Sequence, residues 1–242
     1  MEICGFLSND LSEVMDEITL VLVCKRPVMG VGKQRLVAHF GMEKTQKIAQ
    51  ALLNCALEDA VSWDGPVVIA PASYKDHDWA ASLLPLSKKV KIQPQTSGNL
   101  GQRLNELDRT LRQDGLKKLI FIGSDAPSLT VSDYEACRHA LQRHDTVLIP
   151  ASDGGVALMA SRYPWPELAE LPWSTDRLGV ALADCCRRTG RSVVLLEQRS
   201  DVDEMADCLR LVALLRNDER SARQQLYTLV REFIDKTEIE AC

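Results

Sequence analysis

The chain has 242 residues, of which 45% are hydrophobic, and a formal net charge of −5 at pH 7. This acidic balance excludes a broad basic surface of the kind that holds nucleic acid, and no apolar run is long enough to insert into a membrane. Eight cysteines without any CxxC spacing complete a pattern that is typical of a reduced, cytoplasmic protein.

The apolar pattern alternates between strand and helix periods along most of the chain. Residues 1–16 show weak helical spacing, 18–24 predict a buried strand, and an amphipathic helix is expected over 43–61. Further strands are expected at 67–70, 89–92, 119–122, 146–150, 156–159 and 193–196. Further helices are expected at 72–84, up to about 113, at 131–143, at 176–189 and up to about 215. This order predicts a largely parallel, doubly wound sheet in a single domain, with a core over about 18–215 and a helical extension over about 217–238.

Asp125 stands at the carboxyl end of the strand predicted at 119–122, where Gly123 ends the apolar run. Ligands of open α/β sheets bind beyond the carboxyl ends of the strands, so this carboxylate is suited to hold a divalent cation or to accept a sugar hydroxyl. The alternative is a helix cap, but Thr130 and Ser132 lie closer to the next helix and serve that role better.

The loop over 25–36 concentrates positive charge directly after the first strand. It carries four cations and two glycines: Lys25, Arg26, Gly30, Gly32, Lys33 and Arg35. A di- or triphosphate is the anion that such a loop suits, and the alternative is a solvated basic loop. The loop is no Walker A motif, because Pro27 and Gln34 stand where that motif requires Gly and Ser or Thr.

Four shorter segments fall at predicted strand ends or helix starts. They are Gln95 to Leu104, the turn Asp153-Gly154-Gly155, the tripeptide Trp173-Ser174-Thr175, and Asp201 to Glu204. Each one alone also fits a helix cap or a hairpin turn. Together with Asp125 and the basic loop, however, they supply the carboxylates and cations that a magnesium nucleotide requires.

The order of these motifs resembles that of the bacterial GT-A-type rSAM/selenodomain-associated glycosyltransferases, which are relatives of the molybdenum-cofactor and phospholactate nucleotidyltransferases. The matching positions are Lys25, Pro27, Gly30, Lys33, Arg35 and Leu36, Gln95 to Leu104, Gly123, Asp125, Pro127 and Leu129, Asp153 to Gly155, Pro172 to Thr175, and Asp201 to Asp203. The chain departs from the family at Met29, Gly32, Gln34, Asn99, Val156 and Ala157.

The resemblance, which covers about residues 18–210, implies a three-layer α/β/α GT-A fold and a divalent metal, Mg²⁺ or Mn²⁺. It assigns nucleotide or phosphate binding to Lys25, Gly30, Lys33, Arg35, Gln95, Gly98 and Arg103. The implied metal ligands are Asp125 and Asp203, and the implied catalytic residues are Asp125 and Asp153. The acceptor side would be formed by Gly154, Gly155, Trp173, Ser174 and Thr175.

These residues support three hypotheses. The leading one is a metal-dependent glycosyltransferase that takes a nucleotide-sugar donor and a small-molecule acceptor. A nucleotidyltransferase would use the same residues with a nucleoside triphosphate and release pyrophosphate. A catalytically weakened nucleotide-binding protein is the third, because Val156 and Ala157 replace the aromatic acceptor-side residues of the resembled family. The sequence specifies neither the base nor the acceptor, and the charged C-terminal helix is available for a homodimer under each hypothesis.

Overall fold

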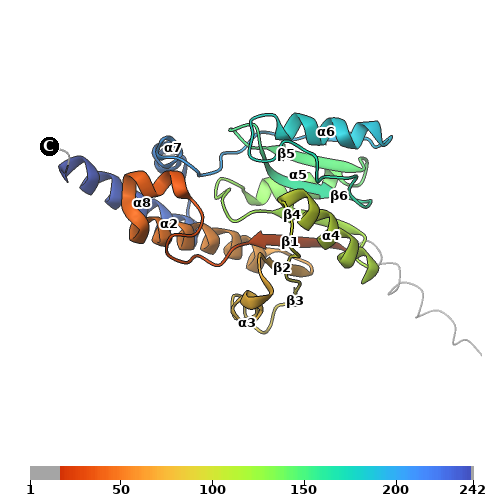
Figure 1. Cartoon of the computed structure of the whole chain (residues 1–242), viewed down its shortest axis with the longest axis horizontal. Helices are drawn as coiled ribbons and strands as arrows, with labels where there is room; N and C mark the ends of the chain where they lie inside the picture. Colours follow the sequence, from red (N-terminus) through yellow and green to blue (C-terminus); the bar gives the residue numbers. More distant parts are fainter. Residues whose placement is uncertain (1–16, 241–242) are drawn as a thin grey trace, which may run out of the picture.

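The computed structural model describes residues 17–240, with side chains described up to residue 235, so the helical spacing noted at 1–16 lies outside the described residues. A seven-stranded sheet in the order β3-β2-β1-β4-β6-β5-β7 forms its centre (Figure 1). The strands are β1 Ile18–Cys24, β2 Val67–Pro71, β3 Val90–Ile92, β4 Lys118–Ile122, β5 Thr146–Pro150, β6 Val156–Ser161 and β7 Val193–Leu195. β6 runs antiparallel to β4 and β5, and the other pairings are parallel. The mostly parallel sheet expected from the sequence is thus confirmed.

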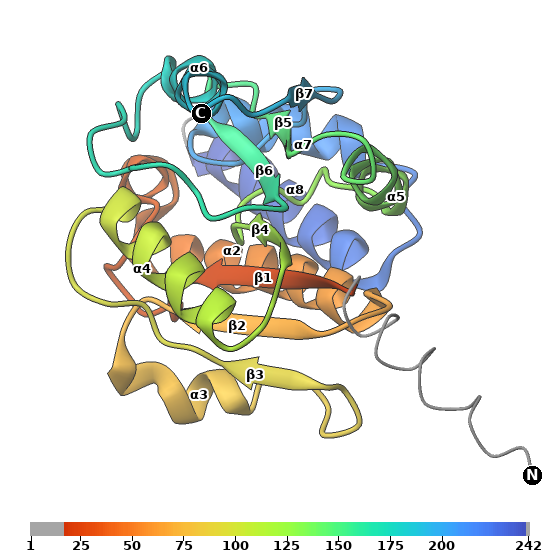
Figure 2. The ribbon, with the colours of Figure 1, turned by 90° about the vertical axis from the view of Figure 1, so that its right-hand side faces the viewer.

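Helices cover both faces of this sheet. They are α2 Gln34–Ser62, α3 His77–Ala81, α4 Leu100–Gln113, α5 Val131–Ala140, α6 Leu178–Arg188, α7 Met205–Leu215 and α8 Ser221–Glu240, with a 3₁₀ turn, η1, at Tyr74–Asp76. One apolar cluster joins the sheet to α4 and α6, and a second joins its other face to α2, α3 and α5. Figure 2 shows α4 and α2 on opposite faces of the sheet. The three-layer arrangement is therefore confirmed. Among residues 17–240, no helix has both the length and the apolar character that crossing a membrane requires.

β1 shows why its residues form a central strand. Leu20 and Leu22 are fully buried in the cluster that contains α2, whereas Val21 is fully buried in the cluster that contains α4. A strand covered on both faces is apolar at every position instead of alternating. This continuous run brings Cys24 and the basic loop to the carboxyl edge of the sheet.

α2 begins earlier than the sequence predicts. It starts at Gln34 instead of near Glu43, and Gly41 interrupts it with a φ of 73° and a ψ of 169°. Because Gly41 breaks the helix, the residues before it do not share the apolar spacing of the residues after it, and the sequence pattern does not reveal them as helical. The loop expected over 25–36 therefore ends earlier, at Lys33. As a consequence, Lys33 stands directly at the helix start with a φ of 48°.

α8 packs along α2 and α7, and its apolar stripe is buried inside the chain. Leu226 and Val230 are fully buried, and Phe233 is 7% exposed. A homodimer would therefore need a surface other than this stripe.

Arg223 of α8 is fully buried. Its guanidinium donates to Asp59 Oδ2 at 2.6 Å, to Glu58 Oε2 at 3.0 Å and to the carbonyl oxygen of Pro127 at 3.3 Å. Burial raises the pKa of Asp59 above its usual value, although Arg223 opposes that rise. The C-terminal helix is thus fixed both to α2 and to the loop that follows β4.

Candidate active site

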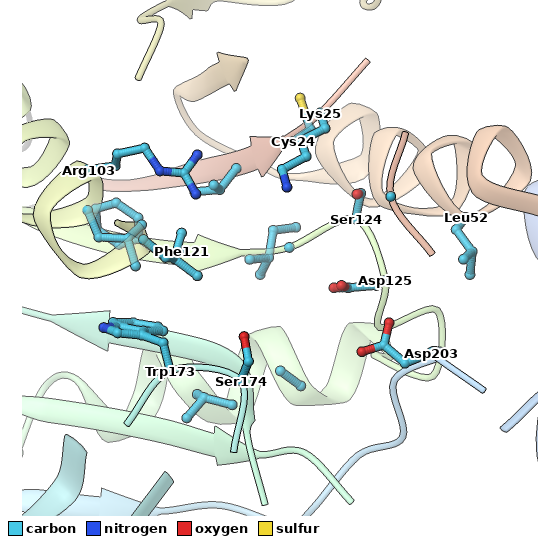
Figure 3. Close-up of a pocket in the computed structure, with 18 of the residues that line it drawn as sticks. Cys24, Lys25, Leu52, Arg103, Phe121, Ser124, Asp125, Trp173, Ser174 and Asp203 are labelled. Carbon is cyan, nitrogen blue, oxygen red and sulfur yellow. The ribbon is translucent and has the colours of Figure 1, made fainter. Parts of the chain in front are cut away.

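A cavity of about 580 Å³ opens at the carboxyl ends of β1 and β4. The chain leaves β1 toward β2 on one side and later returns to β4 on the other side. Such a reversal of strand order opens a crevice between the flanking connections, and this is where α/β proteins bind ligands. Figure 3 shows Lys25 and Arg103 extending into the cavity from one wall, Trp173 and Ser174 opposite them, and Asp125 and Asp203 at one end.

The acidic end is built by two loops that hydrogen bonds hold together. The amide of Val202 donates to the carbonyl oxygen of Asp125 at 3.0 Å. The amide of Ser200 donates to Ser128 Oγ at 2.9 Å, and that hydroxyl donates back to the carbonyl oxygen of Ser200 at 2.5 Å. These bonds set Asp203 beside Asp125, so the structure brings the two predicted metal ligands to the same end of the cavity.

Lys33 lies between these two carboxylates. Its Nζ is 2.5 Å from Asp203 Oδ1 and 3.4 Å from Asp125 Oδ2, and its side chain is 13% exposed. Burial alone would lower the pKa of Lys33, but the two carboxylates raise it above its usual value. The ammonium group therefore stays charged and neutralises part of the acidic end.

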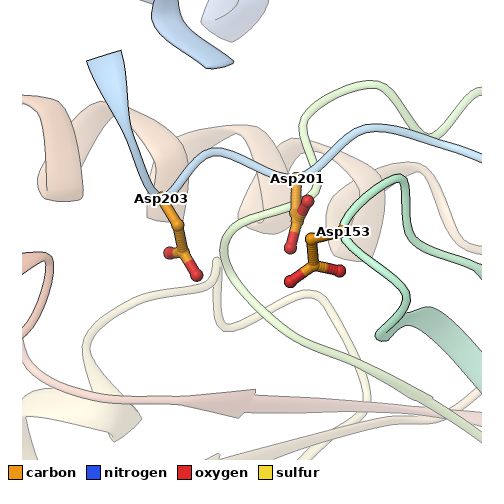
Figure 4. A group of neighbouring side chains, drawn as sticks. All are labelled: Asp153, Asp201 and Asp203. Carbon is orange, nitrogen blue, oxygen red and sulfur yellow. The ribbon is translucent and has the colours of Figure 1, made fainter. Parts of the chain in front are cut away.

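Asp153 and Asp201 extend the acidic end into a cluster with Asp203 (Figure 4). One carboxylate oxygen from each of the three residues lies within 4.8 Å of the others. Oxygen donors of this kind and spacing fit the hard divalent cations Mg²⁺ and Mn²⁺. Asp201 was not among the predicted metal ligands, although its position two residues before Asp203 in an acidic segment was the available signal.

We expect Asp201 to make the stability of the metal-free protein depend on pH. Burial, and then the charge of Asp153, raises the pKa of Asp201 from 3.8 to about 7. Between these values the folded state keeps a proton that the unfolded state has released, so the free energy of unfolding falls as pH rises from about 4 to about 7. Urea unfolding in a chelator should show a shallower fall for Asp201→Asn than for the wild type. Identical pH profiles of the two proteins would contradict the assignment.

The opposite end of the cavity is aromatic and carries one cation. Arg103 Nη1 donates to Gln95 Oε1 at 2.8 Å, and Gln95 Nε2 donates to the carbonyl oxygen of Ala70 at 2.7 Å. Burial lowers the pKa of Arg103. Phe121 of β4 and Trp173 also line this end. Phe121 was not among the predicted site residues, and its place two residues before Gly123 on a central strand was the available signal.

The predicted site residues fall into two groups. Those that line the cavity are Lys25, Lys33, Gln95, Arg103, Asp125, Trp173, Ser174 and Asp203. Those that lie outside its lining are Gly30, Arg35, Gly98, Asp153, Gly154, Gly155 and Thr175. Arg35 is exposed and pairs with Glu204 at 2.8 Å, whereas Asp153 joins the cavity's acidic end through Asp203.

Two departures from the resembled family have local structural roles. Asn99 caps α4, since its side chain accepts from the amide of Gln102 at 2.9 Å. Gln34 Nε2 donates to the carbonyl oxygen of Gly30 at 2.8 Å and so closes the basic loop. Asn99 therefore stabilises the start of α4, and Gln34 stabilises the basic loop.

Gly154 is fixed by both its backbone and its surroundings. Its φ is 88°, and a Cβ there would lie 2.0 Å from the carbonyl oxygen of Asp176. Gly190 offers a matched control, because its φ is 79° but a Cβ at that position would have nothing within 4 Å. We expect Gly190→Ala to cost about 1–2 kcal/mol through backbone strain, and Gly154→Ala to cost at least about 1 kcal/mol more through overpacking. Equal losses in urea unfolding would contradict the close contact.

The fold and the sequence can both be compared with those of known proteins. A Desulfovibrio desulfuricans G20 protein proposed to be a nucleotide-diphospho-sugar transferase has a similar structure, with a TM-score of 0.78, 22% identity, and coverage of 91% of this chain and 96% of that chain. The 4-diphosphocytidyl-2C-methyl-D-erythritol synthase of Anaerococcus prevotii DSM 20548 is similar with a TM-score of 0.53, 11% identity, and coverage of 84% and 100%. These likenesses identify the nucleotide-diphospho-sugar transferase-like fold. No curated protein matches the sequence significantly. The sequence profile of DUF2064, described as "Uncharacterized protein conserved in bacteria", matches residues 54–175, which are half of the chain, and the protein belongs to this family.

Proposed function

We propose that this protein is a metal-dependent transferase that uses a nucleotide-activated donor, with a nucleotide-sugar and a small-molecule acceptor as its substrates. The observation that carries the proposal is the cavity at the ends of β1 and β4, in which Lys25, Lys33, Asp125 and Asp203 converge from separate segments. Carboxylates and cations that meet in one crevice suit a metal-bound diphosphate. The resemblance of the motifs to those of the rSAM/selenodomain-associated glycosyltransferases favours glycosyl over nucleotidyl transfer.

Each charged group has a role in this proposal. Asp125 and Asp203, with Asp153 and Asp201 beside them, would hold Mg²⁺ or Mn²⁺, which when bound neutralises charge that develops on the leaving phosphate. Lys25 and Lys33 would bind the donor phosphates and stabilise the same charge.

The remaining cavity residues would orient the two substrates. Gln95 and Arg103 form the end of the cavity away from the carboxylates and would contact the nucleotide. Trp173 and Ser174 line the opposite wall and would face the acceptor. Asp153, which lies in the turn before β6, would orient the acceptor group that attacks the donor.

A thermal-shift panel tests the proposal. The full chain is heated with nucleotide-sugars or nucleoside triphosphates, each with Mg²⁺, with Mn²⁺ or with a chelator. A ligand at a hundredfold its Kd adds about 2.7 kcal/mol to the free energy of unfolding, which corresponds to a rise of roughly 5–11 °C at this chain length.

The pattern of shifts separates the hypotheses. Metal-dependent stabilisation by nucleotide-sugars supports the proposal, whereas stabilisation by triphosphates alone would indicate nucleotidyl transfer. Binding without turnover of any acceptor would indicate the weakened binding protein. No shift with any nucleotide and either metal would contradict a nucleotide site altogether.

A further inference from the structure

We propose that the ammonium group of Lys33 occupies the position of a cation in the metal-free protein, so that a divalent metal must displace it and the displaced lysine then binds the donor phosphate. Lys33 would thus act as an internal competitor of the metal and as the group that couples metal binding to phosphate binding. This inference rests on the proposed function and adds an order of binding: the displacement of Lys33 from the carboxylates precedes its contact with the phosphate.

The contacts of Lys33 carry the first step. Its Nζ contacts Asp203 Oδ1 at 2.5 Å and Asp125 Oδ2 at 3.4 Å. Asp203 is also one of the three clustered carboxylates whose donor set fits a divalent cation. A metal that bound Asp203 would meet a positive charge already in hydrogen-bond contact with the same carboxylate. Because like charges at such a distance repel strongly in a partly buried site, the metal and the ammonium group compete.

The surroundings of Lys33 carry the second step. Its side chain is 13% exposed, and its backbone is fixed at the start of α2. A displaced ammonium group therefore remains inside the cavity, where it is costly without an anionic partner. Lys33 lines the cavity together with Lys25, so a phosphate group bound there would supply that partner.

Positive coupling between the two ligands follows. Lys33, once displaced from Asp203, would be available to pair with a phosphate, and that pairing would keep Lys33 away from the carboxylates. Such coupling is reciprocal, because each ligand must raise the affinity of the other by the same factor. The metal-free protein is consequently protected from binding a metal tightly before the donor arrives.

Calorimetric titrations of the full chain with Mn²⁺ test this competition. We expect Lys33→Gln to bind Mn²⁺ at least tenfold more tightly than the wild type in the absence of any phosphate, which is about 1.4 kcal/mol. Lys25→Gln is the matched control, because it removes the same charge from the same cavity but from a residue without an ion pair to Asp125 or Asp203 among the described residues. It should change the Mn²⁺ affinity by no more than about threefold. Lys33→Arg retains the charge and should keep the weak wild-type affinity.

A second titration measures the binding of inorganic pyrophosphate at excess Mn²⁺. Lys33→Gln should bind pyrophosphate at least tenfold more weakly than the wild type, so its two affinities change in opposite directions. A residue that merely supported the fold would lower both affinities. If Lys33→Gln binds Mn²⁺ no more tightly than the wild type while both still bind manganese pyrophosphate, this inference fails and the proposed function survives. If neither protein binds Mn²⁺ with or without pyrophosphate, both fail.

Discussion

Arg223→Met is expected to lower the free energy of unfolding by about 3 kcal/mol, because removal of one partner leaves the buried carboxylate of Asp59 without its shortest ion pair. Arg223 is fully buried and pairs with Asp59 at 2.6 Å and with Glu58 at 3.0 Å. The second cation beside Asp59, Arg220, lies farther away at 3.3 Å and is partly exposed. Asp59 is itself 8% exposed, so it cannot recover its lost partner from solvent. The methionine preserves most of the volume, and the loss therefore reports charge instead of a cavity.

Urea unfolding of the full chain measures this loss, and Arg231→Met is its control. Arg231 lies on the same helix, but its side chain is 61% exposed and its ion pair with Asp235 is long, at 3.9 Å. Its replacement should therefore change the free energy of unfolding by less than about 0.5 kcal/mol. Adding Asp59→Asn to Arg223→Met should restore part of the stability, since it removes the buried charge that has lost its shortest ion pair. A loss below about 1 kcal/mol for Arg223→Met would contradict the buried-charge account.

Asp125→Asn should abolish the metal-dependent stabilisation by nucleotide while it leaves the melting point of the ligand-free protein nearly unchanged. At a hundredfold Kd the loss amounts to the full ligand contribution of about 2.7 kcal/mol, or roughly 5–11 °C. The reason is that an amide carries no negative charge for a divalent cation. The fold should tolerate the change, because the Asp125 side chain is 46% exposed and its contact with Lys33 is long, at 3.4 Å.

Asp184→Asn serves as the control for the thermal-shift measurement. Asp184 is a half-exposed carboxylate on α6 that pairs with Arg187, and its replacement should keep the whole ligand-induced shift. Two outcomes would oppose the role given to Asp125. One is a ligand shift that persists in Asp125→Asn, and the other is a collapse of the ligand-free melting point, which would indicate that the carboxylate serves the fold.

The parts of the fold that local patterns determine could be predicted from the sequence. β1 is apolar on both faces, and β4 ends at Ile122, just before Gly123. The strands and the place of Asp125 at the sheet edge therefore follow from composition and spacing. The turn at Gly154 likewise connects the antiparallel pair β5 and β6, as the Asp-Gly pair indicated.

Features that depend on distant partners could not be predicted. Arg223 lies in a charged segment, which is typical of an exposed residue. It is nevertheless buried, because it forms ion pairs with Asp59 and Glu58 of α2. Lys33 was expected to face phosphate only, since nothing in the sequence indicates that two acids lie beside its Nζ. Tertiary packing decides such pairings, and a single sequence does not encode them in any local pattern.

The hydrogen bonds from α8 to the loop after β4 also bear on when the site forms during synthesis. Arg223 donates to the carbonyl oxygen of Pro127, and Arg220 donates to that of Leu129 at 2.8 Å. A chain emerging from the ribosome presents Asp125 long before these arginines, although domains generally fold as units. Because these hydrogen bonds support the loop that carries Asp125, the loop is fully held only after α8 has emerged, and the cavity is completed late in translation.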